Sequence, residues 1–450
     1  MNRLIFREYD IRGVADRDLT DDVVEDIGRA LGTFLTRRGK KRVALGRDCR
    51  LSSDRLHAAL SSGLIATGLT VIDTGVGPTP LLYFTVFHKE LDGGVQITGS
   101  HNPPGDNGFK MMCGKDTLAG DEIRELRTLI ERRDFDLKSG GGIDRYDPSP
   151  AYCGFMRGNV KLKRTDLKFA VDAGNGAGGP LALAAMKAVG LSPIAMYCDM
   201  DGRFPNHHPD PSELHNVAEL AARVQSERLD VGIAYDGDAD RLGVIDERGE
   251  VLWGDKLMIA LSRDILSRHP GAAILGEVKC SQTLYDDIEK HGGRPIVWKT
   301  GHSLIKRKMK EEAALLAGEM SGHLFFADRY FGYDDAIYAS LRLIEMLSEL
   351  DEPLSALLKD VPQTFSTPEI RVDCPDEVKF GVVEKVLSHF RSTHDVLDVD
   401  GARVKFPGGW GLVRASNTQP VLVLRFEAQT QSQLASIQAE VESVVKEARG

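Results

Sequence analysis

The chain has 450 residues, more than one hydrophobic core usually serves, so its length predicts three or four domains. Hydrophobic residues make up 42% and charged residues 28%, which is ordinary for a soluble globular protein, and the sequence contains no low-complexity tract. Acidic residues outnumber basic ones by 67 to 57, for a net charge of −10. We therefore expect no nucleic-acid partner, and an anionic substrate would need a local cluster of basic groups.

The six cysteines lie far apart and form no CxxC pair, so the sequence predicts neither a disulfide framework nor a zinc site. No apolar run is long enough to cross a bilayer, and the first residues lack the apolar segment of a signal peptide. We expect a cytoplasmic protein with no membrane partner.

A short apolar strand, a Gly- or Asp-rich turn and a helical stretch recur along the chain. We expect such strands at residues 42–45, 95–97, 168–171, 229–235 and 273–275. This alternation predicts α/β layers with functional residues at the carboxyl ends of the strands. A strand at residues 369–372 and an amphipathic terminal helix predict a last unit of different character; the helix carries Leu434, Ile437, Val441 and Val444 at helical spacing.

Breaks in composition divide the chain. Residues 138–142 and 147–150 are rich in Gly, Ser and Pro and are predicted to be linker. A turn at residues 246–249 is expected to close the second unit, and residues 361–364 precede the final segment. The predicted domains are residues 1–147, 148–248, 249–363 and 364–450.

The loop at residues 98–110 is a candidate for nucleophilic chemistry. Ser100 follows a predicted strand and precedes two prolines, so we expect the loop to hold its hydroxyl exposed and well fixed. His101 and Lys110 supply nearby groups for proton transfer. An ordinary turn that happens to contain a serine fits the spacing equally well.

Asp236, Asp238 and Asp240 follow the predicted strand at residues 229–235. In an extended segment alternate residues share a face, so the three carboxylates are expected to converge at the end of the strand. They would repel one another unless a cation joined them, and all-oxygen ligation favours Mg²⁺ or Mn²⁺. Arg241 adds a cation suited to phosphate. The alternative is a solvated acidic turn.

Two further loops could contact a sugar phosphate. Glu319 and Ser321 lie between glycines and could hydrogen-bond neighbouring hydroxyls of one sugar. A second loop could donate to phosphate oxygens through Arg414, Ser416, Asn417 and Thr418. Either loop could instead be an exposed polar turn.

Residues 174–179 fit the pattern GxGxxG after a strand, and Asp199 lies near the distance expected of a ribose-binding acid. A dinucleotide site is therefore possible. Because no hydride-transfer constellation accompanies the motif, we interpret it as a structural strand-to-helix turn.

Taken together, four loops resemble the α-D-phosphohexomutase family in their sequence and in their order along the chain. They are the serine loop (residues 98–110), the aspartate loop (236–241), the sugar loop (318–323) and the phosphate loop (414–418). Residues 9–13 and 299–302 also resemble family positions, so the resemblance extends from end to end. The sugar loop, with Met320 in its variable place, resembles the phosphomannomutase/phosphoglucomutase branch.

The resemblance implies four domains around a central cleft: three related α/β units with mixed sheets, and a smaller C-terminal sheet-and-helix domain. It implies that Ser100 carries a phosphoryl group and passes it to a hexose 1- or 6-phosphate. The product, a hexose 1,6-bisphosphate, would also be the activator. One Mg²⁺ per chain would be held by Asp236, Asp238, Asp240 and an oxygen of phosphorylated Ser100.

The resemblance also implies site residues and partners. The implied catalytic residues are Ser100, His101, Lys110, Arg241 and Arg12. The implied substrate-binding residues are Tyr9, Lys279, His302, Glu319, Ser321, His323, Arg414, Ser416, Asn417 and Thr418. The acid and the base are not assigned among them. Sugar phosphates are the expected partners, and we expect a monomer or a weak homo-oligomer.

A site that leaves the sugar 2-hydroxyl unread would accept both glucose and mannose phosphates, and we hypothesise this dual specificity. The alternatives are a phosphoglucosamine mutase, a metal-dependent sugar phosphatase with Asp236 as nucleophile, and a nucleotide-sugar transferase. Asp240 counts against the phosphatase because it replaces the Thr or Val that this chemistry expects. A sugar-phosphate-binding protein without catalysis should lack Ser100 or one of the three aspartates, and this chain keeps all four.

Overall fold

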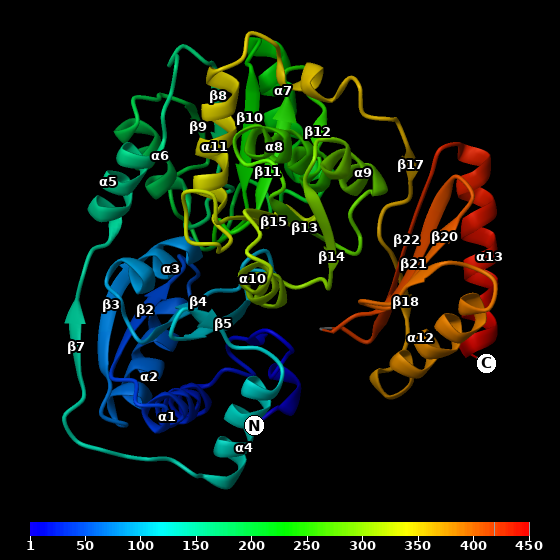
Figure 1. The fold of residues 1–450 in the computed structure, drawn as a ribbon. Helices are drawn as coiled ribbons and strands as arrows, with labels where there is room; N and C mark the ends of the chain where they lie inside the picture. Colours follow the sequence, from blue (N-terminus) through cyan, green and yellow to red (C-terminus); the bar gives the residue numbers. More distant parts are fainter. Residues whose placement is uncertain (418, 450) are drawn as a thin grey trace.

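The computed structural model describes residues 1–417 and 419–449, which fold into four units that follow one another along the chain (Figure 1). The first three units are α/β layers. The fourth, coloured orange to red, lies to one side and is joined to the others through the segment that carries β17 (Phe365–Ser366). The predicted class, four domains of which three are related α/β units, is confirmed.

The first unit is a mixed sheet with helices on both faces. Its strands are β1 (Ile11–Val14), β2 (Arg42–Arg47), β3 (Thr70–Val76), β4 (Gly93–Ile97), β5 (Asp106–Cys113), β6 (Asp116–Thr117) and β7 (Gly142–Arg145). Its helices are the short 3-10 helix Arg3–Ile5, α1 (Asp21–Arg37), α2 (Ser53–Ile65), α3 (Thr79–His88) and α4 (Asp121–Arg132). The strand order is β1-β5-β4-β2-β3-β7, with β6 paired to β5. Along β2, Val43 and Leu45 join the core formed with α1, α2 and α4, while Ala44 joins the core formed with α3, as the two-residue period of a strand requires.

The second unit repeats this architecture with five strands. They are β8 (Phe169–Asp172), β9 (Ile194–Met196), β10 (Val231–Tyr235), β11 (Leu242–Asp246) and β12 (Val251–Leu252), in the order β12-β11-β10-β8-β9. Its helices are α5 (Ser149–Asn159), α6 (Gly179–Ala188), the 3-10 helix Leu214–Asn216 and α7 (Ala218–Glu227). Every residue of β8 and β10 is buried, which explains why residues 169–171 and β10 are continuous apolar runs in the sequence.

The third unit has four strands in the order β14-β13-β15-β16. They are β13 (Ala273–Glu277), β14 (Arg294–Trp298), β15 (Leu316–Gly318) and β16 (Leu324–Phe326). Its helices are α8 (Gly254–Arg268), α9 (Gln282–Lys290), α10 (His302–Glu311), α11 (Ala336–Ser348) and the 3-10 helix Leu354–Leu358. Every residue of α11 is buried, and its apolar side chains belong to one core with those of α3 and α6. The first three units are therefore packed together.

The fourth unit is an antiparallel sheet covered by two helices. Its strands are β17, β18 (Ile370–Asp373), β19 (Val396–Leu397), β20 (Ala402–Phe406), β21 (Gly409–Ala415) and β22 (Val421–Ala428), and its helices are α12 (Asp376–Arg391) and α13 (Gln431–Arg449). The predicted terminal helix is α13, whose four apolar positions named above are all buried against the sheet.

Three of the predicted functional loops occupy the same topological position, because the first three units share one strand order. The sets β3-β2-β4-β5, β9-β8-β10-β11 and β14-β13-β15-β16 each contain three parallel strands and then one antiparallel strand. The serine loop, the aspartate loop and the sugar loop each join the last parallel strand to that antiparallel strand. The phosphate loop joins β21 to β22. One topological position therefore presents three of the four motifs.

Two predicted breaks differ in detail. The segment predicted as linker at residues 138–142 ends where β7 begins, and β7 pairs in parallel with β3, so the first sheet continues to Arg145. The turn at residues 246–249 lies inside the hairpin of β11 and β12, so the second sheet continues to Leu252. The glycines at residues 138–142 predicted a linker, but glycines are also found at the start of an edge strand such as β7, so composition alone does not distinguish the two.

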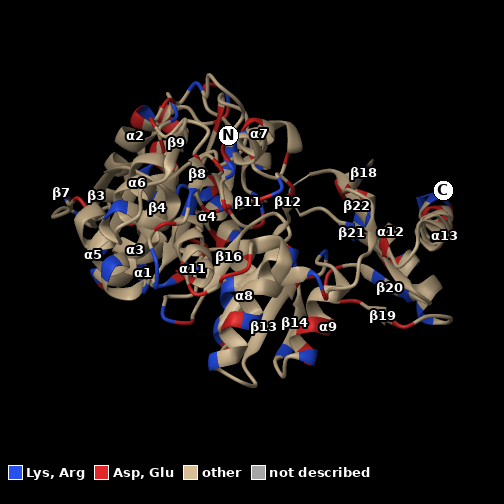
Figure 2. Ribbon diagram, turned by 90° about the horizontal axis from the view of Figure 1, so that it is seen from above, with Lys and Arg blue, Asp and Glu red and all other residues tan. Residues whose placement is uncertain are grey.

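Within the described residues, none of the helices has the length and apolar character needed to cross a membrane. Basic and acidic residues are interspersed over the ribbon (Figure 2).

Candidate active site

The aspartate loop gathers three buried carboxylates directly after β10. Oxygen atoms of Asp236, Asp238 and Asp240 lie within 4.8 Å of one another, and all three residues are fully buried. The segment is a turn, in which the amide of Ala239 donates to the carbonyl of Asp236 at 3.0 Å. The convergence is as predicted, but the reason given for it, alternation along an extended strand, is wrong, because the turn curls the side chains toward one point.

These carboxylates fit a hard cation. Burial, and then the charges of Asp240 and Asp238, raise the pKa of Asp236 well above its ordinary value. The Lys110 ammonium donates to Asp238 Oδ2 at 2.6 Å and also to Asp240 Oδ2. Among the described residues, Asp238 Oδ1 and Asp240 Oδ1 find no hydrogen-bond partner. One ammonium among three carboxylates leaves a buried negative excess that a divalent ion bound through oxygen would neutralise.

Ser100 lies at the carboxyl end of β4, against the aspartate loop. Its Oγ donates to Asp236 Oδ2 at 2.7 Å and lies 3.1 Å from His101 Nδ1. The expectation of an exposed hydroxyl is wrong, because Ser100 is 2% exposed. The aspartate loop covers it so closely that a Cβ on Gly237 would lie 2.4 Å from the Ser100 carbonyl oxygen.

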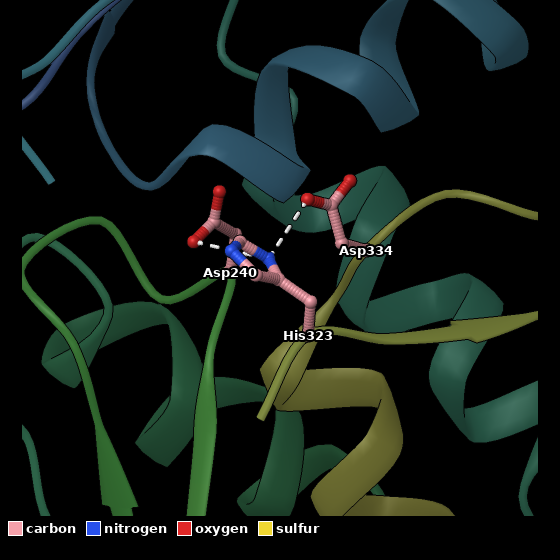
Figure 3. A group of neighbouring side chains, drawn as sticks. All are labelled: Asp240, His323 and Asp334. Atoms are coloured by element: carbon pink, nitrogen blue, oxygen red, sulfur yellow. Dashed lines mark ion pairs between the residues drawn. The ribbon is translucent and has the colours of Figure 1, made fainter. Parts of the chain in front are cut away.

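Arg241 and His323 connect the aspartate loop to the sugar loop. Arg241 Nε donates to His323 Nε2 at 3.0 Å. His323 Nδ1 lies 3.1 Å from Asp334 Oδ2 and 3.6 Å from Asp240 Oδ1 (Figure 3). Asp240, His323 and Asp334 are also close enough to hold a metal. However, Nε2 needs its lone pair to accept from Arg241, which leaves a proton on Nδ1 facing the carboxylates. His323 therefore faces Asp240 and Asp334 with an N–H and not with a lone pair that could bind a metal, so the three aspartates of the loop fit the ion better.

A chain of aromatic contacts continues from His323 to the fourth unit. The His323 ring stacks on that of His302 at 5.8 Å between centroids, and Tyr9 meets His302 edge-on at 6.1 Å. The Tyr9 hydroxyl accepts from Asn417 Nδ2 at 2.7 Å and donates to the Thr300 carbonyl at 2.9 Å. Burial raises the pKa of Tyr9 well above its ordinary value, so the phenol remains protonated. Tyr9 thus joins the first, third and fourth units.

In the sugar loop, Glu319 is buried next to Ser321. Glu319 Oε1 accepts from the Gly301 amide at 3.1 Å, and Oε2 accepts from Ser321 Oγ at 3.2 Å. The two residues predicted to read sugar hydroxyls are therefore adjacent in space and share a hydrogen bond.

The predicted phosphate-binding part of the site contains two cationic side chains, Arg414 and Lys279. Arg414 Nε donates to Asp400 at 2.9 Å, and Lys279 Nζ donates to Glu369 at 2.5 Å across the boundary between the third and fourth units. Ser416 follows Arg414 at the end of β21, and its Oγ accepts from the Gln419 amide at 3.1 Å. Thr418 lies outside the described residues.

Arg12 approaches the serine loop from β1. Its guanidinium donates to Asn102 Oδ1 at 2.9 Å and to Asp10 at 2.6 Å. With Arg12, every described residue of the predicted site is accounted for, and the contacts link the loops of all four units into one region.

The glycine-rich segment at residues 174–179 connects β8 to α6, as predicted. It supports the aspartate loop, because the Ala177 amide donates to the Gly237 carbonyl at 2.9 Å. A Cβ on Gly176 would lie 2.8 Å from that same oxygen.

Sequence reasoning missed three residues of this site. Thr79, at the start of α3, donates through its hydroxyl to Asp238, and Lys306 donates to Asp334 at 2.9 Å. Asp334 in turn faces His323. Thr79 follows a proline at a helix start, which is a detectable signal for a helix N-terminus but not for a contact with a residue 159 positions away.

Comparisons with known proteins agree with this architecture. The phosphoglucomutase/phosphomannomutase domain models match in order: α/β/α domain I at residues 3–137, domain II at 150–249, domain III at 253–365 and the C-terminal domain at 369–444. The chain therefore belongs to the phosphoglucomutase/phosphomannomutase family.

Similar proteins cover nearly the whole chain. A phosphomannomutase/phosphoglucomutase of Pseudomonas aeruginosa is 46% identical over 96% of this chain and 93% of its own length. A phosphoglucomutase of Neisseria gonorrhoeae is 45% identical over 99% of this chain and 97% of its own length. The crystal structure of a phosphoglucomutase/phosphomannomutase family protein from Burkholderia thailandensis superposes with a TM-score of 0.94 at 41% identity, covering 100% of this chain and 98% of that one.

A divalent ion should stabilise the metal-free protein. At 100 times its dissociation constant, Mg²⁺ or Mn²⁺ should raise the free energy of unfolding by about 2.7 kcal/mol, because only the folded chain gathers the three carboxylates. Urea unfolding with and without metal measures this gain. In Asp236→Asn most of the gain should disappear at the same metal concentration. A surface control, Asp134→Asn/Asp136→Asn, removes two acids that pair with Arg37 and should keep the full gain. An unchanged gain in Asp236→Asn would contradict the site.

Proposed function

We propose that this protein interconverts hexose 1-phosphates and hexose 6-phosphates through a phosphorylated serine and a hexose 1,6-bisphosphate. The observation that supports it best is the contact of Ser100 Oγ with Asp236 at 2.7 Å, inside a buried group of three aspartates. A serine that carries phosphate at that position would place its ester beside a site for a divalent cation.

The chemistry is a transfer in two halves. The bond between phosphorus and Ser100 Oγ breaks as the free hydroxyl of the bound sugar phosphate forms a new bond to phosphorus. The proton of that hydroxyl passes to a base, and Ser100 Oγ takes up a proton. The resulting bisphosphate turns over. Ser100 Oγ then gives up its proton and bonds to the phosphorus of the other phosphate, whose bond to the sugar oxygen breaks as that oxygen takes up a proton. The first half transfers a phosphoryl group from Ser100 to a sugar oxygen, and the second transfers one from a sugar oxygen to Ser100. The same residues can therefore serve both halves.

Named residues would perform these tasks. Asp236, Asp238 and Asp240 would hold one Mg²⁺, which when bound neutralises charge on the transferring phosphoryl group. Arg241 lies beside the ion site and would neutralise the same group. Arg12, His101, Lys110, His302 and His323 are the candidates for proton transfer. His101 Nδ1, at 3.1 Å, is near enough to exchange a proton with Ser100 Oγ.

The remaining residues would hold the substrate. Glu319 and Ser321 would read two sugar hydroxyls, next to His302, His323 and Tyr9. Lys279 and the loop of Arg414, Ser416, Asn417 and Thr418 would bind the phosphate that does not react, in both orientations of the bisphosphate. The Tyr9–Asn417 hydrogen bond supports this arrangement, since it joins the phosphate loop to the first unit.

We extend the proposal to the protein as a whole. The domains divide at residues 147/148 and 363/364, and the division predicted at 248/249 moves to the end of β12 at Leu252, because 248/249 falls inside the hairpin of β11 and β12. The hexose 1,6-bisphosphate acts as activator, and the protein works in the cytoplasm as a monomer or weak homo-oligomer. Size-exclusion chromatography with light scattering measures the last property, and a stable tetramer would refute it.

Phosphorylation of Ser100 tests the proposed function directly. After incubation with glucose 1,6-bisphosphate and Mg²⁺, mass spectrometry of the digested protein should find one phosphoryl group, on the peptide that contains Ser100. Phosphate on an aspartate, or none on the protein while substrate is turned over, would favour the phosphatase alternative.

We predict dual specificity for glucose and mannose phosphates. The kcat/KM values for glucose 1-phosphate and mannose 1-phosphate should be comparable, because no residue is assigned to the 2-hydroxyl that distinguishes them. Coupled assays with each sugar measure the ratio. A preference above roughly a thousandfold, about 4 kcal/mol, would exclude it. Turnover of glucosamine phosphate alone would place the protein in the glucosamine branch.

A further inference from the structure

A buried arginine outside the predicted site holds the serine loop from behind. Arg50 lies between β2 and α2, and its side chain is fully buried. Its Nη1 donates to the carbonyls of Pro103 at 2.5 Å and Asp106 at 3.0 Å. Its Nη2 donates to the carbonyls of Ser100 at 2.6 Å and Asn102 at 2.7 Å. One guanidinium therefore binds four carbonyl oxygens of the loop that carries Ser100.

Asp48 completes this support. Its carboxylate lies 3.2 Å from Arg50 Nε and also accepts from the Gly99 amide at 3.2 Å. Asp48 Oδ1 accepts from the Arg50 amide at 3.0 Å and from Ser53 Oγ at 2.6 Å. The charge of Arg50 is thus compensated in the interior by a carboxylate that is itself fixed at the start of α2.

The serine loop needs such support because its backbone is strained. Ser100 has φ of +49°, the left-handed region that residues other than glycine rarely adopt because it brings Cβ too close to the backbone. The Ser100 carbonyl is caught between Arg50 Nη2 and the aspartate loop, where a Cβ on Gly237 would lie 2.4 Å from it. Release of this carbonyl would let the peptide rotate and would move Oγ away from Asp236.

We infer that Arg50 is a positioning residue for phosphoryl transfer: by binding four loop carbonyls it fixes the Ser100 backbone, and with it the separation of Ser100 Oγ from the ion site. Arg50 touches no reacting atom. The inference rests on the proposed function for its kinetic consequence, while the ordering of the loop follows from the contacts alone.

Gly99 supplies an independent way to test the contact. A Cβ at Gly99 would lie 2.5 Å from Arg50 Cζ and 2.6 Å from Nε. The guanidinium is the far end of a side chain, but its hydrogen bonds leave it nowhere to move without releasing the loop. Gly99→Ala should therefore displace the guanidinium from the carbonyls, whereas in Arg50→Ala the same methyl group meets no guanidinium.

The experiment is a double-mutant cycle. Because a misplacement of about 1 Å costs roughly a hundredfold in rate, Gly99→Ala and Arg50→Ala should each lower kcat about a hundredfold with KM changed less than about threefold. The double variant should be no more than about threefold slower than Arg50→Ala. Multiplication of the two losses, to roughly ten-thousandfold, would overturn the inference. Arg29→Ala, which removes partly buried pairs with Glu25 and Asp26 on α1, is the matched control and should keep kcat.

Hydrogen exchange separates this inference from the proposed function. In protein without substrate, Arg50→Ala should speed amide exchange in the peptide covering residues 98–110 and leave the α13 peptide unchanged. Unchanged exchange at the serine loop would overturn the inference even if the enzyme is active, and faster exchange would support it even if no mutase activity is found. If Arg50→Ala does not fold, Arg50→Lys takes its place: it keeps the charge but cannot reach four carbonyls, and wild-type kcat and exchange in Arg50→Lys would overturn the inference.

Discussion

Ser100→Ala should abolish mutase turnover, lowering kcat by at least about 10⁴-fold, because no other group can carry the phosphoryl between the two halves of the reaction. The smaller alanine side chain fits the buried position, and the variant loses the contacts of the hydroxyl with Asp236 and His101. The fold should therefore persist, which circular dichroism and thermal unfolding can verify. The coupled assay for glucose 6-phosphate formation measures the rate.

The control for this variant is Ser226→Ala, on an exposed face of α7, where the hydroxyl donates to the carbonyl of Arg223. It should retain full activity. A phosphatase with Asp236 as nucleophile would lose little when Ser100 is replaced. Release of inorganic phosphate by Ser100→Ala at the unsubstituted rate would therefore contradict the proposed mechanism.

Lys110→Met should destabilise the metal-free protein by about 3–5 kcal/mol, because it leaves Asp238 and Asp240 buried without their cation. Burial alone would lower the pKa of Lys110, but those two carboxylates outweigh it and raise the pKa, so the ammonium remains charged. Urea unfolding in EDTA measures the loss. Activity should fall as well, since Lys110 is also a candidate for proton transfer.

Metal should reverse part of this loss. Removal of the ammonium makes the ion site more negative and should tighten its hold on Mg²⁺, so the stability deficit should be smaller in saturating Mg²⁺ than in EDTA. Lys405→Met, which removes an exposed pair with Asp395, should cost much less under both conditions. Equal deficits of Lys110→Met with and without Mg²⁺ would show that Lys110 and the ion do not share the carboxylates.

Local patterns in the sequence were enough to predict the elements that carry the site. The apolar run before Asp236 predicts a buried strand because a strand covered on both faces must be apolar at every position, and β10 is such a strand. Helical spacing of Leu434 and Ile437 predicts α13 in the same way. Burial of Ser100 could not be predicted, because the aspartate loop that covers it lies more than a hundred residues further along the chain.

The residues that hold the functional loops in place could not be predicted either, because they contact residues that are distant in the sequence. Arg50, Thr79, Lys306 and Asp334 act through contacts with distant loops, and an isolated arginine or threonine has no periodic or motif signal. Lys306 lies on α10 and Asp334 lies in the segment after β16, so their ion pair depends on how α10 packs against β16. Resemblance to a family supplied the order of the four loops, whereas only the structure shows what holds them in place.

Phosphorus-31 NMR tests the central claim most directly. The protein would be mixed with Mg²⁺, mannose 1-phosphate and a trace of hexose 1,6-bisphosphate, and the spectrum followed with time. Our account predicts that the 1-phosphate signal is replaced by that of the 6-phosphate, with no inorganic phosphate released and no conversion in Ser100→Ala. Growth of an inorganic phosphate signal in place of the 6-phosphate, or conversion that persists in Ser100→Ala, would contradict it.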